Sequence, residues 1–306
     1  MKSATLETAP MESAARPRIA DYVQLTRPRL GAMVLFTVAV GYFMGAGSDA
    51  RAITLLHTLF GTALVAMGAS AINQWMERKT DVLMRRTANR PLPAGRLHPA
   101  EAFVFGAVLG IGGTLWLALA LPTAHSAIIA ASTLLSYVLI YTPLKRITVW
   151  NTVVGAIPGA LPPLIGWCAA RGEITLEGLS LFAILFVWQL PHFFAIAWLY
   201  RDDYAAGGMR MLPIVDPDGR VTAQAMIGLC VLLIPVSMGP ALLQMTGQLF
   251  LVCSVLLSVY FLVCAMEFRR NRTRENARYV LKASLYYLGG LMLLLLVDGV
   301  LPRQLL

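Results

Sequence analysis

Three oxygen-bearing side chains lie four residues apart at the end of a long apolar stretch: Asn73, Glu77 and Asp81. On an α-helix, residues i and i+4 lie one above the other, so these groups would form a stripe about two turns long. Amide and carboxylate oxygens suit Mg²⁺, which takes one or two carboxylates and shares the rest of its shell with substrate phosphates. The stripe therefore predicts a metal site. The alternative is an ordinary boundary network, in which the two acids pair with neighbouring Lys and Arg side chains.

Three arginines follow within the string "RRTANRP", namely Arg85, Arg86 and Arg90. Planar guanidinium groups match phosphate oxygens and stay charged at any working pH. Anchoring at a membrane surface would explain any one of these arginines, but it does not explain acids in metal-like spacing beside them. Acids that hold Mg²⁺ together with arginines that hold anionic oxygens are what a bound diphosphate requires.

A second polar stretch, "YRDDYAAGGMRMLP" at residues 200–213, again combines bases with acids. It contains Arg201, Asp202 and Asp203. Adjacent residues on a helix point about 100° apart, so only one of the two aspartates faces a given site. We expect Asp203 to be a metal ligand and Asp202 to assist it. The alternative is a solvated helix end.

A third element, "YTPLKR", contains Tyr141, Lys145 and Arg146. The basic pair could be a simple membrane anchor, which is the commoner case. Tyr141 and Pro143, directly before the pair, suggest instead a shaped entrance on the same side as the other two elements.

The composition indicates that a membrane surrounds these elements. Of the 306 residues, 58% are hydrophobic and only 13% are charged, and the mean hydropathy is +0.67. A soluble domain of this length is nearer one half apolar and one quarter charged. Apolar stretches of 18 or more residues recur, and each can cross about 30 Å of hydrocarbon as a helix. We therefore expect an all-α polytopic membrane protein.

The apolar stretches predict nine transmembrane helices. Their expected ranges are 30–48, 53–75, 100–121, 124–143, 151–170, 176–199, 222–243, 247–267 and 279–301. The expected organisation is an N-terminal arm (1–29), a single transmembrane domain (30–301) and a short C-terminal tail (302–306). The polar loops 77–98 and 200–220 lie on the same side of the membrane.

The distribution of basic residues predicts the orientation. All but three of the 25 Lys and Arg residues fall in the arm and in the connections on the side of the two polar loops. The three exceptions are Arg51, Arg171 and Arg303. Basic residues favour the cytoplasmic side, so we expect a cytoplasmic N-terminus and a C-terminus outside. Because the basic residues gather on one side, the net charge of +9 reflects orientation in the membrane, and no nucleic-acid partner is expected.

Two features stand out inside the expected spans. Gln189 and His192 flank Pro191 in "WQLPHF". A histidine inside the membrane is rare and is a functional candidate, although it could simply donate a hydrogen bond to a backbone carbonyl. The fifth span, "NTVVGAIPGALPPLIGW", is rich in Gly and Pro, which fits a kinked, closely packed helix, room for a bulky ligand, or both.

The N-terminus and the cysteines narrow the cellular location. The first twenty or so residues contain acids and lack an apolar core, unlike a secretory signal or a transit peptide. The four cysteines lie in apolar segments without metal-like or disulfide-like spacing and are expected to be buried small hydrophobic residues. A bacterial inner membrane is the simplest expected location.

These motifs resemble the UbiA superfamily of intramembrane prenyltransferases, which share NxxxDxxxD and RTxxRP in one polar loop and a second Asp-rich motif in another. The strings "YTPLKRITVWNTVVGAIPGALPPLIGW", "WQLPHFFAIAW" and "YRDDYAAGGMRMLP" are similar to the branch of that superfamily that farnesylates haem. The resemblance covers most of residues 21–301. It implies a nine-helix fold, farnesyl diphosphate as donor, Mg²⁺ as metal and haem B as acceptor. The implied product is haem O, and a haem A synthase is a candidate partner.

The resemblance also implies roles for individual residues. The metal ligands would be Asn73, Glu77, Asp81, Asp202 and Asp203. The diphosphate would be bound by Arg86, Arg90, Lys145, Arg146, Arg201 and Tyr141. His192 and Gln189 would contact haem, and His192, Asp81 and Asp203 would act in catalysis.

Two positions depart from the superfamily pattern. Glu77 stands where the superfamily more often has Asp, and Asp203 has Leu199 and Gly207, not a second Asp, four residues away. The second departure leaves open whether Asp203 holds a metal of its own. Other UbiA-type enzymes, acting on aromatic quinone precursors or on a chlorophyll-type acceptor, remain an alternative function. A secondary transporter is a further alternative, but it would place acids near the bilayer midplane.

Overall fold

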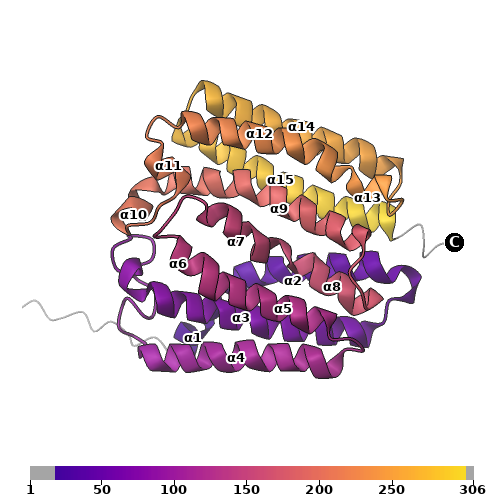
Figure 1. Ribbon diagram of the computed structural model, residues 1–306. Coiled ribbons are helices and arrows are strands. Elements are labelled where there is room, and N and C mark those ends of the chain that lie inside the picture. Colours follow the sequence, from indigo (N-terminus) through magenta and orange to yellow (C-terminus); the bar gives the residue numbers. More distant parts are fainter. Residues whose placement is uncertain (1–17, 301–306) are drawn as a thin grey trace, which may run out of the picture.

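The computed structural model describes residues 18–300, and within that range the chain forms helices and turns without a strand (Figure 1). Nine segments in this range are long and apolar enough to cross a membrane. Five are single or nearly unbroken helices: α3 (Ala52–Asp81), α4 (Pro99–Ala120), α9 (Leu176–Leu199), α14 (Gln248–Arg270) and α15 (Arg274–Gly299). Four are composite: α2 with η1 (Pro28–Ala46, Gly47–Asp49), α5 with η2 and α6 (His125–Leu135, Ser136–Tyr141, Thr142–Leu144), α7 with α8 (Asn151–Ala160, Pro162–Arg171), and α12 with α13 (Arg220–Ser237, Gly239–Leu242).

These segments confirm the predicted all-helical fold and the nine predicted spans, whose ends agree to within about six residues. The helix that carries Asn73, Glu77 and Asp81 continues to Asp81, so the three do lie on one α-helix. Three short helices lie outside the spans: α1 (Arg18–Thr26), α10 (Arg201–Ala206) and α11 (Leu212–Val215). The first was not predicted, since it falls in the expected arm. Residues 1–17 of that arm and the expected tail at 302–306 lie outside the described residues.

Helix α1 is attached to the bundle by polar contacts from its buried side. Gln74 Nε2 donates to the Leu25 carbonyl at 2.8 Å, and Arg96 Nε donates to Asp21 Oδ1 at 2.7 Å. Asp21 is buried, whereas Ile19 and Val23 on the same short helix are exposed. Polar contacts on one side and exposed apolar groups on the other are typical of a helix at a membrane interface.

The Gly- and Pro-rich fifth span is interrupted at Leu161, between α7 and α8. The α8 half packs backbone to backbone against α2, because a Cβ on Gly166 or Gly41 would meet a main-chain carbonyl of the other helix. Close packing through small residues therefore explains this half of the span. In the α7 half, Gly155 lies under the Tyr141 ring and Gly159 under the Gln189 amide. There the missing side chains make room for two of the predicted site residues.

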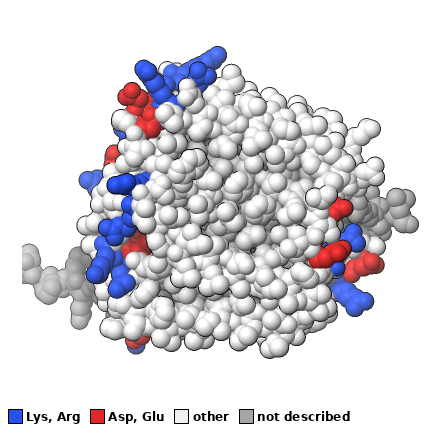
Figure 2. Space-filling model, in the orientation of Figure 1, with Lys and Arg blue, Asp and Glu red and all other residues white. Residues whose placement is uncertain are grey.

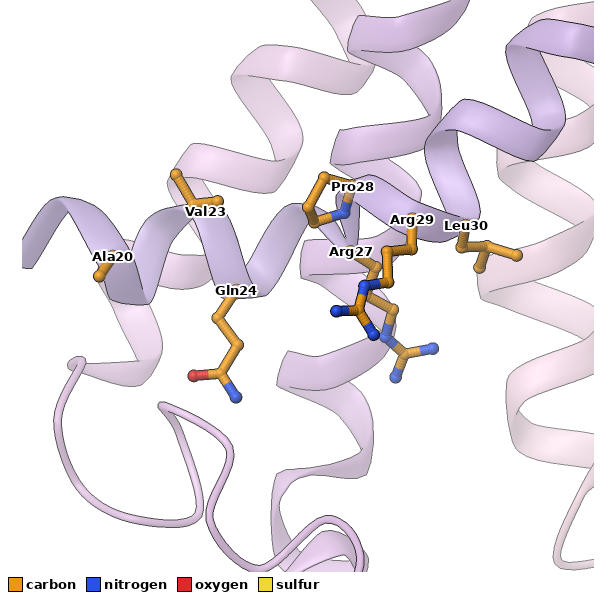
Figure 3. A pocket seen from close by; sticks show the side chains of 7 residues that line it. All are labelled: Ala20, Val23, Gln24, Arg27, Pro28, Arg29 and Leu30. Carbon is orange, nitrogen blue, oxygen red and sulfur yellow. The ribbon is translucent and has the colours of Figure 1, made fainter.

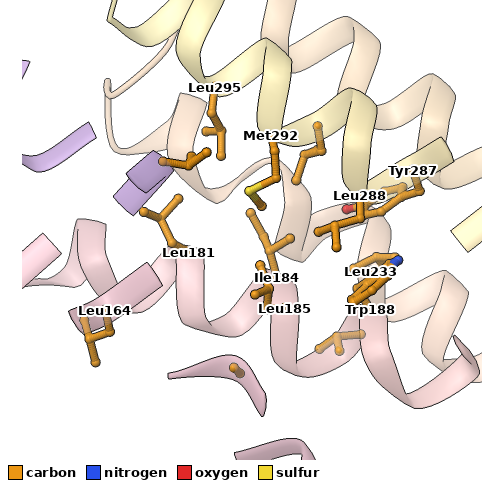
Figure 4. Packing of buried hydrophobic residues seen from close by; sticks show 14 of the residues in the cluster. Leu164, Leu181, Ile184, Leu185, Trp188, Leu233, Tyr287, Leu288, Met292 and Leu295 are labelled. Atoms are coloured by element: carbon orange, nitrogen blue, oxygen red, sulfur yellow. The ribbon is translucent and has the colours of Figure 1, made fainter. Parts of the chain in front are cut away.

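Helix α9 packs among α7, α8, α12 and α15 and supplies much of the apolar core. In Figure 4, Trp188 of α9 lies beside Leu233 of α12 and Tyr287 and Leu288 of α15. The outer surface is apolar as well, and Leu119 is 85% exposed. An apolar exterior around an apolar core fits a protein surrounded by lipid.

Charged side chains gather at the two ends of the bundle, and Lys and Arg concentrate at one of them (Figure 2). This basic end is where α3 and α9 finish and where α10 and α11 lie (Figure 1). We call it the polar-loop end. At the opposite end, Arg51 and Arg171 are the basic residues among those the structure describes.

Candidate active site

Three of the predicted site residues, Glu77, Lys145 and Arg146, line a cavity of about 190 Å³ at the polar-loop end. The cavity is lined by Met76, Glu77, Thr80, Thr142, Pro143, Lys145, Arg146 and Met209. The helix ending at Asp81 supplies Glu77, the end of the fourth span is followed by the two bases, and the α10–α11 connection supplies Met209. Segments far apart in the sequence thus form one polar mouth on an apolar bundle.

Two ion pairs form the centre of this cluster. Lys145 Nζ lies 2.6 Å from Glu77 Oε1, and each side chain is only 10% exposed. Arg90 Nη1 lies 2.7 Å from Asp81 Oδ2, and the Asp81 side chain is fully buried. The structure therefore joins two of the predicted metal-binding acids, Glu77 and Asp81, to predicted diphosphate-binding cations. Both cations come from segments that are separate from the acids' helix, so the pairs also fix the loops to α3.

The cations keep their charge in this environment. Burial lowers the pKa of Arg90, and the positive charge of Arg27 lowers it further, but Asp81 opposes both effects. Burial alone would also lower the pKa of Lys145, but Tyr141 and the Glu77 carboxylate outweigh it, so the pKa lies above its usual range. In each ion pair, the nearby carboxylate favours the charged form of its cation.

Two buried oxygens in the stripe are available as metal ligands. Asn73 Oδ1 and Asp81 Oδ1 are buried and make no hydrogen bond within residues 18–300, and unpaired buried acceptors are uncommon in proteins. Asn73 Nδ2 donates to Thr142 Oγ1 at 3.1 Å, which fixes the orientation of the amide. Asn73 and Asp81 are eight positions apart, which is about 12 Å along the helix, so a single ion cannot contact both.

Within the described residues, no three His, Cys, Asp or Glu side chains gather as a metal cage. That observation agrees with Mg²⁺ chemistry, since Mg²⁺ commonly takes one or two carboxylates and completes its shell with water and substrate phosphates. The residues present therefore fit Mg²⁺ held jointly with a diphosphate.

The two aspartates of the second polar stretch are placed differently. Asp203 Oδ1 accepts a hydrogen bond from the Arg85 backbone N–H at 3.3 Å, so it joins the two polar loops. Asp202 is 85% exposed and lies 3.8 Å from Arg201. The structure thus brings Asp203 to the first loop and leaves Asp202 in solvent. Arg201 covers the Trp198 ring at 5.0 Å, away from the ion pairs.

Aromatic rings position two further predicted cations. The Arg86 guanidinium lies 4.5 Å from the Tyr204 ring centre, and Lys145 Nζ lies 4.4 Å from the Tyr141 ring centre. Such contacts hold a cation over a ring face and leave its hydrogen-bond donors available. Arg146 is exposed at the edge of the cavity.

Arg27 lies near enough to the cluster for its charge to act there, and it was not among the predicted site residues. Its charge acts on Arg90, and its backbone adopts the left-handed conformation, with φ 49°. That conformation is uncommon for a residue other than glycine and costs about 1–3 kcal/mol. Arg27 and Arg29 project from the α1–α2 turn beside an open hollow of about 530 Å³ (Figure 3). The signal in the sequence was the pair of arginines around Pro28, directly before the first span.

His192 and Gln189 lie deeper in the bundle, apart from the ion pairs. Gln189 Nε2 donates to the Ala156 carbonyl at 2.7 Å. His192 Nδ1 lies 2.8 Å from Ser284 Oγ, so its partner is a hydroxyl and not the backbone carbonyl considered above. His192 also stacks on Trp188, with ring centres 5.0 Å apart.

Comparison with known proteins gives the family. The profile of the UbiA prenyltransferase family matches residues 34–288. The chain belongs to the UbiA prenyltransferase family. It is 49% identical to the protoheme IX farnesyltransferase of Solibacter usitatus, with 90% of this chain and 98% of that protein covered. It is 44% identical to the protoheme IX farnesyltransferase of Salinibacter ruber, with 91% and 98% covered.

Solved structures share the fold. A digeranylgeranylglyceryl phosphate synthase superposes with a TM-score of 0.76 at 19% identity, covering 92% of this chain and 99% of that one. A UbiA homologue from Archaeoglobus fulgidus, bound to DMAPP and Mg²⁺, superposes with a TM-score of 0.67 at 16% identity, covering 89% and 99%. The family and the nine spans make this UbiA protein a multi-pass membrane prenyltransferase.

Proposed function

We propose that this prenyltransferase moves the farnesyl group of farnesyl diphosphate onto a vinyl group of haem B, giving haem O and diphosphate. The observation that carries the proposal is the buried cluster of two acids and two cations at the mouth of an apolar bundle, in a chain 49% identical to a protoheme IX farnesyltransferase. A charged head and a long apolar tail match that combination of polar mouth and apolar interior.

In this proposal, Arg90, Lys145 and Arg86 bind the diphosphate oxygens. Oxygens of Asn73, Glu77 and Asp81 hold Mg²⁺, and Asn73 and Asp81 contact different ions because they lie about 12 Å apart along the helix. When bound, the metal neutralises charge on the departing diphosphate. The cations do the same from fixed positions, and because the groups are already oriented, little reorganisation is needed as the allylic C–O bond breaks and its electron pair leaves with the diphosphate.

The bundle's own residues control what happens next. The apolar core excludes water from the allylic cation, so the haem vinyl group can attack it first. Water then adds to the resulting carbocation and a proton is lost, which leaves a hydroxyethylfarnesyl group. His192 and Gln189, which lie deeper than the ion pairs, are the proposed haem contacts.

The remaining assignments follow from placement. Asp203 is proposed to support the metal site from the second loop, whereas Asp202, Arg201, Arg146 and Tyr141 act at its edge. The polar-loop end is proposed to face the cytoplasm of a bacterial cell, across the inner membrane. A haem A synthase is the proposed recipient of the product, since haem O is its substrate class.

The test is expression in a bacterial host that lacks its own haem O synthase, followed by chromatography of the extracted haems. We expect haem O to appear with the full-length chain and not with Asp81→Asn, provided that both proteins reach the membrane in equal amounts. The proposal fails if the wild-type chain is present in the membrane and no haem O forms.

A further inference from the structure

The hydroxyl of Ser284 has only one proton, and the structure shows where that proton goes. Ser284 Oγ lies 2.6 Å from the Leu281 carbonyl oxygen in the same helix, and 2.8 Å from His192 Nδ1. A carbonyl oxygen can only accept, so the serine proton must lie toward Leu281; otherwise two oxygen lone pairs would face each other at 2.6 Å. His192 must then donate from Nδ1–H to Ser284.

This hydrogen bond selects one tautomer of the neutral imidazole. With the proton on Nδ1, the lone pair is on Nε2. His192 is only partly buried, and Nε2 makes no hydrogen bond within residues 18–300. Nε2 therefore carries a free lone pair.

A second contact holds the ring in place. Trp188 Nε1 donates to the Ser284 carbonyl at 2.7 Å, and the Trp188 and His192 rings stack at an angle of 25°. The indole therefore links α9 to α15 and covers one face of the imidazole. Trp188 binds the backbone of Ser284 and His192 binds its side chain, so the two contacts can be removed separately.

The depth of the histidine separates it from the diphosphate cluster. His192 lies eight positions before Tyr200, the C-cap of α9, which is a rise of about 12 Å along the helix. Protein histidines that ligate metals almost always donate their other ring N–H to a fixed acceptor, which orients the ring and raises its basicity. Ser284 supplies that acceptor.

We infer that Ser284 is a positioning residue that holds His192 with its Nε2 lone pair directed at the iron of the haem substrate, as an axial ligand. The inference rests on the proposed function, because it takes haem as the acceptor. It assigns the histidine to holding the macrocycle, not to activating water.

The test uses the purified full-length chain in lipid nanodiscs, titrated with haem B. Resonance Raman spectra of the ferrous complex report the iron–histidine stretch directly. We expect this band in the wild type and its loss in His192→Ala, with added imidazole restoring an iron–imidazole band. In Ser284→Ala the band should move to lower frequency, because the ligand loses its hydrogen-bond acceptor, and the Kd for haem should rise about 10–100-fold.

Ser254→Ala is the matched control. Ser254 is also fully buried in a spanning helix and donates to the carbonyl three residues earlier, but no histidine contacts it. We expect its band and Kd to equal those of the wild type. A merely structural serine would leave the band of Ser284→Ala unmoved.

The possible results distinguish the axial ligand, the role of Ser284 and the proposed function. If the wild type binds haem and makes haem O, but lacks the iron–histidine band or keeps it in His192→Ala, the axial assignment is overturned and the proposed function stands. If Ser284→Ala has an unchanged band and Kd, the role of Ser284 is overturned. If the wild type neither binds haem nor makes haem O, the proposed function itself fails.

Discussion

Replacing Lys145 by methionine should separate the structural role of the buried ion pair from its role in catalysis. Methionine fills a similar volume without a charge, so Glu77 would be left buried and unpaired. Removing one partner of a buried ion pair typically destabilises a protein by about 3–5 kcal/mol, because the remaining charge is not compensated. We expect a fall of that size in the free energy of unfolding.

The double variant Glu77→Gln/Lys145→Met removes both charges. Replacing a buried ion pair by neutral groups of similar volume is commonly close to neutral, so the double variant should recover most of the lost stability. It should not recover activity, since removing one group that stabilises a transition state commonly costs about 10²–10³ in kcat. Stability is measured by denaturant titration in detergent micelles, and activity by diphosphate release.

Arg146→Met is the matched control for stability, because Arg146 is the next residue along the chain and is exposed. Its effect on unfolding should stay within about 0.5 kcal/mol. Either of two results would contradict the stabilising role of this ion pair: Lys145→Met as stable as Arg146→Met, or a double variant no more stable than Lys145→Met.

Three further predictions concern neighbouring contacts. Asp203→Asn should lower turnover about 100-fold. Asp202 lies in solvent, so Asp202→Asn should keep turnover within about twofold. Equal effects of the two substitutions on diphosphate release would contradict the different placement of the two aspartates. Gly155→Ala should force the Tyr141 ring away, cost about 1–3 kcal/mol of stability and raise the KM for farnesyl diphosphate. Gly228→Ala, with open space at its Cβ, should do neither, and matching KM values would rule out the steric argument. Arg96→Met should leave Asp21 buried and unpaired and speed amide exchange across α1 at least about 100-fold. Arg18→Met, which breaks only an exposed pair with Glu101, should not, so comparable exchange rates would refute the anchoring role of Arg96.

The elements that position the site could be predicted from the sequence because each has a strong physical signature. Lipid demands about 20 consecutive apolar residues, so the nine spans were visible as runs of hydropathy. The four-residue spacing of Asn73, Glu77 and Asp81 needed only helical periodicity to become a stripe. Both features are local, and both are present in the structure.

Contacts between distant segments could not be predicted in the same way. Nothing in the spacing of Glu77 and Lys145 shows that they lie 2.6 Å apart, because that distance depends on how the second and fourth spans pack. The sequence favoured Asp203 over Asp202 as the ligand, but it could not show that Asp203 accepts a hydrogen bond from the first loop while Asp202 lies in solvent. Ser284 gave no signal, since a lone serine in an apolar span is ordinary until its neighbour across the helix interface is known.

The pairing of acids with cations has a consequence for how the metal and the diphosphate bind. Glu77 and Asp81 are the proposed metal ligands, and Lys145 and Arg90 the proposed diphosphate ligands, yet they neutralise one another in pairs. Mg²⁺ alone would bring two positive charges beside Lys145 and Arg90. A diphosphate alone would bring negative charge beside Glu77 and Asp81. Each is therefore opposed by like charge in a weakly screened site, where such repulsion is strong.

Bound together, the two ligands cancel that repulsion, so we expect positive coupling between them. Coupling free energies between sites are typically about 1–3 kcal/mol, or 5–150-fold in affinity. The assay is the thermal midpoint of the protein in nanodiscs with millimolar Mg²⁺, with a non-ionising farnesyl thiolodiphosphate, and with both. Their joint stabilisation should exceed the sum of the separate ones. In Glu77→Gln/Lys145→Met one opposing pair is gone, so the excess should shrink. Simple additivity in the wild-type protein would show that the ion pairs do not link the two ligands.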